Sequence, residues 1–309
     1  MENTPLVSIC STTYNLEKYI GEALESWLSQ KTNFDYEIVI CDDCSKDKTV
    51  VVIESFVEKY PNKIRLLKAA KNMGMMPNYI RSLQAARGKY IAVCDGDDYW
   101  IDENKLQLQV DFLESNTDFV ACLTNSYVIN ELTGEKKIAK HQIWDVATSK
   151  ELLYHDDFHK DNINLSPGHV STYIFRNNLI TEFPTWFYDD DVVTDYPLYM
   201  LISKYGKTKF FNINTSVYRK RDGSHSFNWY DYRKIQKSRI KMHKCVNDYL
   251  DRRYKDILNI IISKHYICLF KSYLKEKEYI AAIKSFVCAA YFSFSTLFKY
   301  IFINRKLDV

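Results

Sequence analysis

Short apolar runs alternate with amphipathic segments along the first hundred residues of this 309-residue chain. The apolar runs are typical of buried β-strands, and the segments between them repeat their apolar residues at helical spacing. This alternation predicts an α/β half-domain of nucleotide-binding type, built on a parallel sheet. The predicted strands are 6–10, 37–41, 64–68 and 90–94, and the predicted helices are 18–30, 47–60 and 79–86.

The second half of the chain has a less regular pattern. Strands are predicted at 119–128 and 210–218, and a loop enters a further strand within 165–176. A helix is predicted from Pro197 to about Lys204, because Pro is common in a first helical turn. From about residue 228 the pattern is helical, with predicted helices at 257–274 and 279–303.

Charge and aromatic content separate the C-terminal part from the rest. We expect one α/β domain at 1–240 and a helical, basic and aromatic extension at 241–309, which carries 13 Lys/Arg against 6 Asp/Glu. Its longest uncharged run, 285–298, is shorter than the roughly 20 residues that span a bilayer. Such helices suit peripheral contact with an anionic membrane surface. Packing on the catalytic domain, or a homodimer contact, would explain them equally well.

Cysteine usage and the N-terminus indicate a reducing compartment. No signal-peptide pattern precedes the first strand, and most of the eight cysteines lie within apolar runs. Cys41 and Cys44 have metal-ligand spacing, but no second pair completes a zinc site. We therefore expect a cytoplasmic protein, at most peripheral at the inner face of the membrane. Nucleic-acid binding is not expected, because residues 1–240 are net acidic.

Polar side chains follow each of the predicted parallel strands, at the edge where such sheets bind ligands. Asp95, Asp97 and Asp98 follow the fourth strand and repel one another unless a cation or a polar ligand is present. A solvated acidic turn is the alternative. The chain has neither common Gly-rich phosphate loop, so a cation on the acidic turn is the available means of holding phosphate. The polar segments after the first three strands are 11–15, 42–45 and 72–78.

Five short segments, in this order along the chain, resemble the sequence motifs of family-2-type inverting glycosyltransferases with a GT-A fold. The segments are 7–15, 39–45, 72–74, 87–90 and 95–100. The resemblance covers about residues 5–230. It implies a Rossmann-like nucleotide-binding half, a mixed sheet with helices on both faces, and sugar transfer with inversion. The donor would be a nucleotide-diphosphate sugar, with a UDP-sugar favoured. The acceptor would be a hydroxyl of a glycan or lipid-linked saccharide in cell-surface polysaccharide synthesis.

The resemblance also implies roles for individual residues. Asp95 and Asp97 would form an Asp-x-Asp pair, and Asp97 or Asp98 would reach a Mn²⁺ or Mg²⁺ ion. Many relatives have Pro at position 12 or 13, so this chain departs from the family near the base. The expected nucleotide-sugar-binding residues are Thr12, Thr13, Tyr14, Asn15, Asp43, Asn72, Asp95, Asp97 and Arg219.

Asp195 is the expected catalytic base, because Asp195-Tyr196-Pro197-Leu198 matches a variant of the family's base motif. A plain helix-capping role is the alternative, and Asp189, Asp190 and Asp191 are rivals for the base. Arg219, Arg221 or His225 would contact the diphosphate, or they are surface charges. His169 would contact acceptor or phosphate, or it is structural.

Two functional classes remain. One is a metal-dependent glycosyltransferase. The other is a catalytically silent relative that binds nucleotide-sugar or partners only. A nucleotidyltransferase is disfavoured, because no Gly-, Arg- and Lys-rich phosphate loop follows the first strand.

Overall fold

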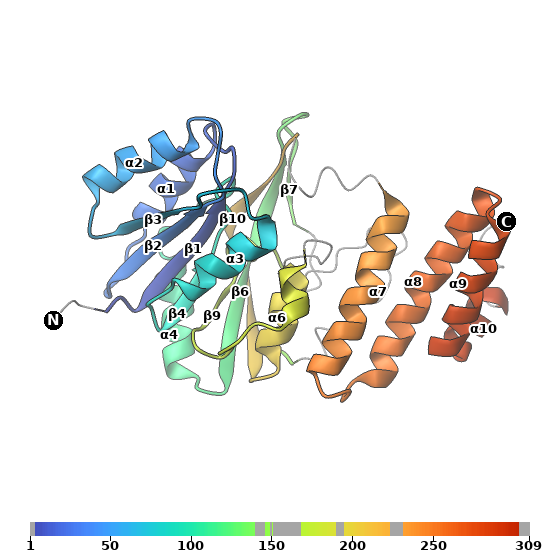
Figure 1. Cartoon of the computed structure of the whole chain (residues 1–309). Helices are drawn as coiled ribbons and strands as arrows, with labels where there is room; N and C mark the ends of the chain where they lie inside the picture. The colour runs from blue at the N-terminus through green and yellow to red at the C-terminus, as the bar shows by residue number, and fades with distance from the viewer. Residues whose placement is uncertain are drawn as a thin grey trace. The chain divides into compact units, whose positions relative to one another are not determined.

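The computed structural model describes residues 4–139, 146–148, 150, 168–189, 195–222 and 231–302. Backbone contacts divide the chain into two compact units (Figure 1). The first holds 1–149, 166–190 and 202–224, and the second holds 150–165, 191–201 and 225–309. The predicted boundary at residue 240 falls inside helix α7 (Tyr232–Tyr249).

The first unit contains a ten-stranded mixed sheet ordered β3-β2-β1-β4-β9-β6-β10-β5, with β7 beside β6 and β8 beside β10. Four parallel neighbours form the predicted half-domain, and the antiparallel β9 joins β4 to β6. The parallel strands are β1 (Val7–Thr13), β2 (Tyr36–Asp42), β3 (Ile64–Lys68) and β4 (Tyr90–Val93). The others are β5 (Tyr99–Trp100), β6 (Phe119–Asn130), β7 (Lys136–Ile138), β8 (Val146–Ala147), β9 (Ile174–Arg176) and β10 (Lys207–Lys220).

Helices cover both faces of this sheet (Figure 1). Helices α1 (Ile20–Leu28), α2 (Thr49–Lys59) and α4 (Lys105–Ser115) pack their apolar stripes on one face. Helix α3 (Met75–Gln84) covers the other, where the Cys10 thiol donates to the Ser82 carbonyl. Successive strand residues point to opposite faces, so the parallel strands are apolar on both sides. The predicted α/β class with helices on both faces is confirmed.

The second unit is helical in its described part. Its buried centre includes stacked rings of His243 and His265, whose centroids lie 5.4 Å apart. His265 Nδ1 lies 2.7 Å from Gln236 Oε1, and the Tyr196 ring meets His243 edge-on. No described helix is both long and apolar enough to cross a bilayer. Besides α7, the helices are α6 (Asp195–Ser203, of which 195–201 belong to this unit), α8 (Lys255–Lys275), α9 (Tyr279–Phe292) and α10 (Phe294–Phe302).

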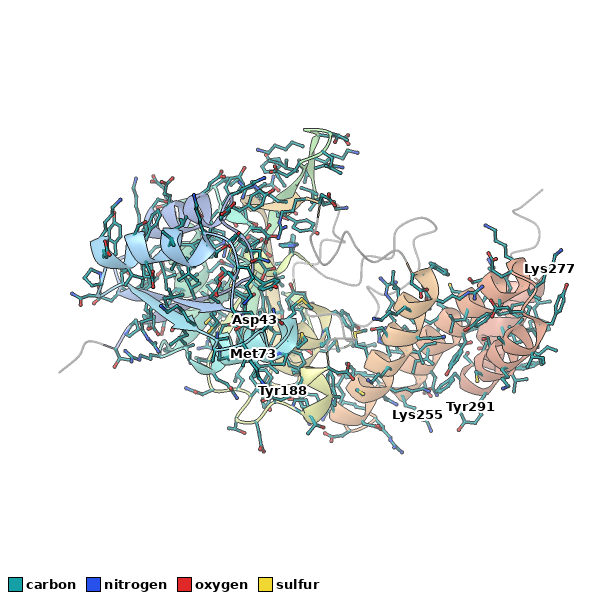
Figure 2. All side chains as sticks on the ribbon, turned by 45° about the horizontal axis from the view of Figure 1, so that its top comes forward. Asp43, Met73, Tyr188, Lys255, Lys277 and Tyr291 are labelled. Atoms are coloured by element: carbon teal, nitrogen blue, oxygen red, sulfur yellow. The ribbon has the colours of Figure 1, made fainter. Side chains whose placement is uncertain are left out.

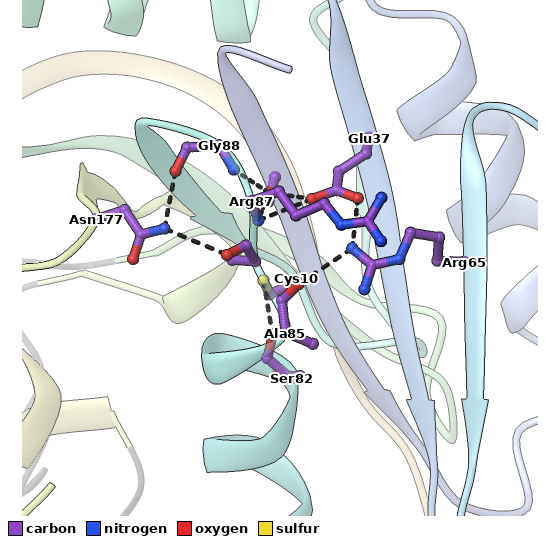
Figure 3. A network of polar contacts seen from close by, with 10 residues as sticks. Cys10, Glu37, Arg65, Ser82, Ala85, Arg87, Gly88 and Asn177 are labelled. Carbon is purple, nitrogen blue, oxygen red and sulfur yellow. Dashed lines mark hydrogen bonds and ion pairs between the residues drawn. The ribbon is translucent and has the colours of Figure 1, made fainter. Parts of the chain in front are cut away.

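A polar network fixes the start of β1 against the turn before β4 (Figure 3). Ser8 Oγ donates to Glu37 Oε1 at 2.7 Å and accepts the Gly88 amide at 2.8 Å. The Arg87 amide donates to the same Glu37 oxygen at 2.9 Å, and Arg65 Nη1 donates to Glu37 Oε2 at 2.7 Å. These bonds satisfy polar groups that would otherwise be buried without partners.

Gly88 leaves no room for a side chain in this network. An added Cβ would lie 2.6 Å from the Ser8 nitrogen and 2.9 Å from the Tyr90 carbonyl oxygen. We expect Gly88→Ala to destabilise the protein by about 1–3 kcal/mol, as overpacking typically does. The measurement is urea unfolding followed by circular dichroism.

Gly21 is the matched control, because its Cβ would meet only Val52 Cγ1, at 3.9 Å. It lies inside α1, so Gly21→Ala should raise stability by up to about 1 kcal/mol. Equal stability of the two variants would contradict the tight approach at Gly88.

Candidate active site

The carboxyl ends of β1, β2 and β4 meet at one edge of the sheet, as the sequence pattern predicts. The Asp43 amide donates to the Thr13 carbonyl at 2.9 Å. On the other side, the Gly96 amide donates to the Thr12 carbonyl at 3.4 Å. Backbone bonds therefore place the residues after three strands beside one another, and β1 lies in the middle.

Asp43 shapes the loop that follows β3. Its buried carboxylate accepts the amides of Met73 and Gly74 at 2.8 and 3.1 Å, and Figure 2 shows Asp43 beside Met73. Asn72 Nδ2 donates to the Asp43 carbonyl at 3.3 Å. In this structure the Asp43 side chain therefore holds the 72–74 loop at the sheet edge. Its role in nucleotide binding stays a prediction.

The loop after β1 is fixed by the loop after β2. Asn15 has a positive φ of 54°, its amide donates to Ser45 Oγ at 3.0 Å, and its side-chain oxygen accepts the Lys46 amide at 2.8 Å. Thr13 Oγ1 donates to Asp42 Oδ1 at 3.0 Å. Tyr14 lies in this hydrogen-bonded loop after β1 with 45% of its surface exposed, so its ring is accessible to a ligand.

The acidic turn packs closely on the segment after β1. The Asp98 amide donates to the Asp95 carbonyl at 3.0 Å, which closes the turn. A Cβ at Gly96 would lie 2.7 Å from the Thr13 methyl group, so glycine permits this approach. Asp98 is 1% exposed, whereas Asp95 and Asp97 are half-buried. Burial, and then the charges of Asp97 and Asp95, raise the pKa of Asp98 well above its usual value.

Arg219 of β10 is the cation that organises this turn. Its side chain is 6% exposed, and its Nη1 donates to the Asp97 carbonyl at 2.8 Å. Its amide donates to Asp98 Oδ1 at 3.0 Å. Nε donates to Glu131 Oε1 at 3.1 Å, and Nη2 forms an ion pair with Glu22. The guanidinium donors thus bind protein groups, and the predicted contact of Arg219 with the donor stays a prediction.

Arg221 and His169 complete the surroundings of the turn. Arg221 Nε donates to Asp97 Oδ2 at 2.8 Å. His169 Nδ1 lies 3.3 Å from Asp98 Oδ2, and its ring stacks on Tyr218 with centroids 4.1 Å apart. Asp98 Oδ2 is buried and accepts no hydrogen bond from the described residues.

A divalent cation fits the donor chemistry of this turn. Hard cations are commonly held by one or two carboxylates together with phosphate oxygens and water. The turn offers carboxylate oxygens, among them the buried Oδ2 of Asp98. Within the described residues, no group of three or more His, Cys, Asp or Glu side chains forms a protein-only metal site.

The other predicted residues have different outcomes. Thr12 is half-buried at the end of β1. Asp195 begins α6 in the second unit, and its side chain lies outside the described residues, as do Asp190, Asp191 and His225. Its role as base stays a prediction. The sequence interpretation missed Glu22 and Glu131, because an acidic residue in a first helical turn or after a strand is common without any ligand.

The family model described as "Glycosyl transferase family 2" matches residues 8–188, which is more than half of the chain. The chain belongs to glycosyl transferase family 2. An uncharacterised glycosyltransferase of Haemophilus influenzae is 30% identical over 215 residues, covering 67% of this chain and 62% of that protein. An uncharacterised protein of Mycobacterium tuberculosis is 41% identical over 125 residues, covering 40% of this chain and 36% of its own length. TuaG of Bacillus subtilis, a glycosyltransferase provisionally assigned to teichuronic acid biosynthesis, is 34% identical over 109 residues, covering 35% and 42%.

Solved structures show the same fold. Staphylococcus aureus TarS 1–349, in complex with UDP-GlcNAc, aligns with a TM-score of 0.68 at 20% identity, over 91% of this chain and 79% of that one. The mannosyltransferase PcManGT from Pyrobaculum calidifontis, in complex with GDP-Man and Mn²⁺, aligns with a TM-score of 0.52 at 15% identity, over 96% and 87%. This family member therefore has the GT-A fold expected from the resemblance, followed by the C-terminal helices expected from the sequence pattern.

Arg219→Lys is predicted to loosen the acidic turn. Lysine keeps the charge, but its single nitrogen replaces the three guanidinium nitrogens that donate separately to Glu22, Glu131 and the Asp97 carbonyl. Losing one such bond to a charged group costs about 2 kcal/mol, so amides of 95–100 should exchange roughly 30-fold faster. The measurement is hydrogen–deuterium exchange by mass spectrometry.

Arg221→Lys is the control for this prediction, because Arg221 contacts the turn through a single ion pair with the Asp97 side chain. It should change exchange in 95–100 only slightly, and β2 should be unaffected in both variants. Unchanged exchange of 95–100 in Arg219→Lys would show that Arg219 does not hold the turn.

Proposed function

We propose that this protein is an inverting glycosyltransferase that moves a sugar from a nucleotide-diphosphate donor, with a UDP-sugar favoured, to an acceptor hydroxyl. The observation that carries the proposal is the buried acidic turn, held by Arg219 at the sheet edge that also carries Tyr14 and Asp43. Ligands of open α/β sheets bind at this edge. The complexes of TarS with UDP-GlcNAc and of PcManGT with GDP-Man support a nucleotide-sugar donor.

The donor would lie across the ends of β1, β2 and β4. Tyr14 would stack on the base, and Thr12, Thr13, Asn15, Asp43 and Asn72 would line the nucleoside side. Arg221 would face the diphosphate from beside Asp97. Arg219 would act mainly by positioning the turn, since its guanidinium already binds Glu22 and Glu131.

Mn²⁺ or Mg²⁺ would be held by Asp97 or Asp98, with Asp95 beside them. Bound there, the ion supplies Lewis-acid stabilisation of the negative charge on the departing diphosphate. The buried Asp98 Oδ2 and the Mn²⁺ in the PcManGT complex support this assignment.

Asp195 would accept the proton of the acceptor hydroxyl as that oxygen attacks the anomeric carbon. Inversion requires the base to lie on the side of the sugar opposite the diphosphate. The acceptor would be a glycan or lipid-linked saccharide of a cell-surface polysaccharide, an assignment supported by the name of TuaG. The alternative is a catalytically silent relative that binds nucleotide-sugar only.

Substitutions should separate donor binding from transfer. Asp97→Asn removes a carboxylate from the turn, so Mn²⁺-dependent binding of the donor nucleotide should be lost. Asp195→Asn should keep donor binding and lower the transfer rate by about 10²- to 10⁴-fold, the usual contribution of a general base. The measurements are calorimetry with UDP and Mn²⁺, and turnover or slow hydrolysis across a panel of nucleotide-sugars.

Asp189→Asn is the matched control for the base and should transfer at the wild-type rate. Full activity of Asp195→Asn would exclude Asp195 as base. If the wild type binds UDP and Mn²⁺ but neither transfers nor hydrolyses any donor of the panel, the silent alternative holds.

A further inference from the structure

The second unit contains a basic groove between α7, α8 and α9, with a volume of about 450 Å³. Four lysines line it, and no acidic side chain lines it among the residues that the structure describes. The floor is apolar, with Ile240 and Leu269. The lysines are Lys237, Lys241 and Lys244 of α7 and Lys284 of α9, and Tyr266 and Tyr273 lie beside them.

The charges of this groove are concentrated on one helical face and supported by aromatic rings. The three lysines of α7 follow one another at i, i+4 and i+7, which places them on a single stripe. Lys244 Nζ lies 3.4 Å from Tyr266 Oη and 5.1 Å from the Phe292 ring centroid. These contacts orient an ammonium group without cancelling its charge. Like charges gathered in this way favour an anionic ligand.

An apolar ridge runs along the outer side of α9. Ile280, Ile283, Val287 and Tyr291 are 75%, 63%, 59% and 83% exposed, and their spacing of three and four residues forms one stripe. Phe294, at the start of α10, is 70% exposed. Contiguous apolar surface of this kind marks a binding surface in a soluble protein.

The ridge adjoins the groove. A second hollow, at the turn between α8 and α9, is lined by Lys277, Glu278, Tyr279 and Ile280, and it shares Ala281 and Lys284 with the basic groove. The Glu278 carboxylate is paired with Arg233 Nη1 at 2.6 Å. Figure 2 shows Lys277 and Tyr291 on this helical unit. Cationic and apolar binding elements are therefore continuous across α9.

We propose that this surface docks on an anionic phospholipid bilayer, with lipid phosphates in the lysine groove and the α9 ridge among the outermost acyl carbons. A bilayer places a layer of phosphates directly beside hydrocarbon, which matches the two adjoining elements. Nucleic acid would supply phosphates for the lysines but no hydrocarbon for the α9 ridge. A second copy of the chain would match the groove only if it brought acidic groups to the four lysines. The surface is formed by α7, α8 and α9, and none of these helices carries a residue assigned above to donor binding or catalysis.

Vesicle flotation of the full chain tests the proposal. Wild type should float with phosphatidylglycerol vesicles, should remain unbound with phosphatidylcholine vesicles, and should be released by salt. Lys237→Glu/Lys284→Glu should weaken binding at least about 25-fold, because each lysine near an anionic surface contributes about fivefold. Ile283→Asp/Val287→Asp should also weaken it, although the lysines remain.

Lys59→Glu/Lys255→Glu is the charge-matched control, because both lysines are exposed and neither lines the groove. This control should bind vesicles like wild type. Thermal melts followed by circular dichroism check that all variants are folded. Equal loss in this control, or equal binding of wild type to both lipids, would overturn the proposal. Complete release by glycerol phosphate would point to a soluble phosphate ligand instead. Loss of self-association in Ile283→Asp/Val287→Asp, without vesicle binding by wild type, would show that the ridge is a dimer contact.

Discussion

The carboxyl edge of the sheet depends on the contacts of Arg219, whose guanidinium pairs with Glu22 and Glu131 and donates to the Asp97 carbonyl. Three carboxylates occupy positions 95, 97 and 98, and Asp98 is almost fully buried. A buried carboxylate is strongly destabilising unless it is paired and hydrogen-bonded. The Arg219 guanidinium supplies a cation and donates to the Asp97 carbonyl, and the Arg219 backbone amide donates to Asp98 Oδ1. It also pairs with Glu22, so one side chain connects α1, β10 and the turn after β4.

This arrangement explains how an acidic turn remains ordered at the sheet edge. The guanidinium satisfies the Asp97 carbonyl and the carboxylates of Glu22 and Glu131. Asp98 Oδ2 accepts no hydrogen bond within the described part of the chain, and it lies 3.3 Å from His169 Nδ1. Without these contacts the three carboxylates would repel one another and spread the turn apart.

Much of this sheet edge could be predicted from the sequence, because the local spacing of apolar residues indicates where each strand and helix lies. The first four strands and the helices between them lie close to the predicted ranges, and their carboxyl ends meet as expected. Helix α3 starts at Met75 rather than residue 79, because Gly74, with φ of 95°, turns the chain into the helix earlier. The predicted helix 279–303 is interrupted at Ser293, which adopts an extended conformation.

Features that depend on long-range contacts could not be predicted. Arg219 contacts residues more than 120 positions away, and no local pattern distinguishes it from Arg221. Lys105 is fully buried over the Trp100 ring, and burial lowers its pKa to about 8, although the sequence would place a lysine at the surface. The basic groove of the second unit likewise forms only when α7 packs against α8 and α9.

The proposed donor site places the diphosphate and a divalent ion at the acidic turn 95–98. The decisive measurement is a crystal structure with UDP and Mn²⁺, in which anomalous scattering locates the metal. We expect Mn²⁺ bound to a carboxylate oxygen of Asp97 or Asp98 and to a diphosphate oxygen, with the uracil beside Tyr14. A diphosphate bound away from this turn, or a metal coordinated elsewhere, would contradict it.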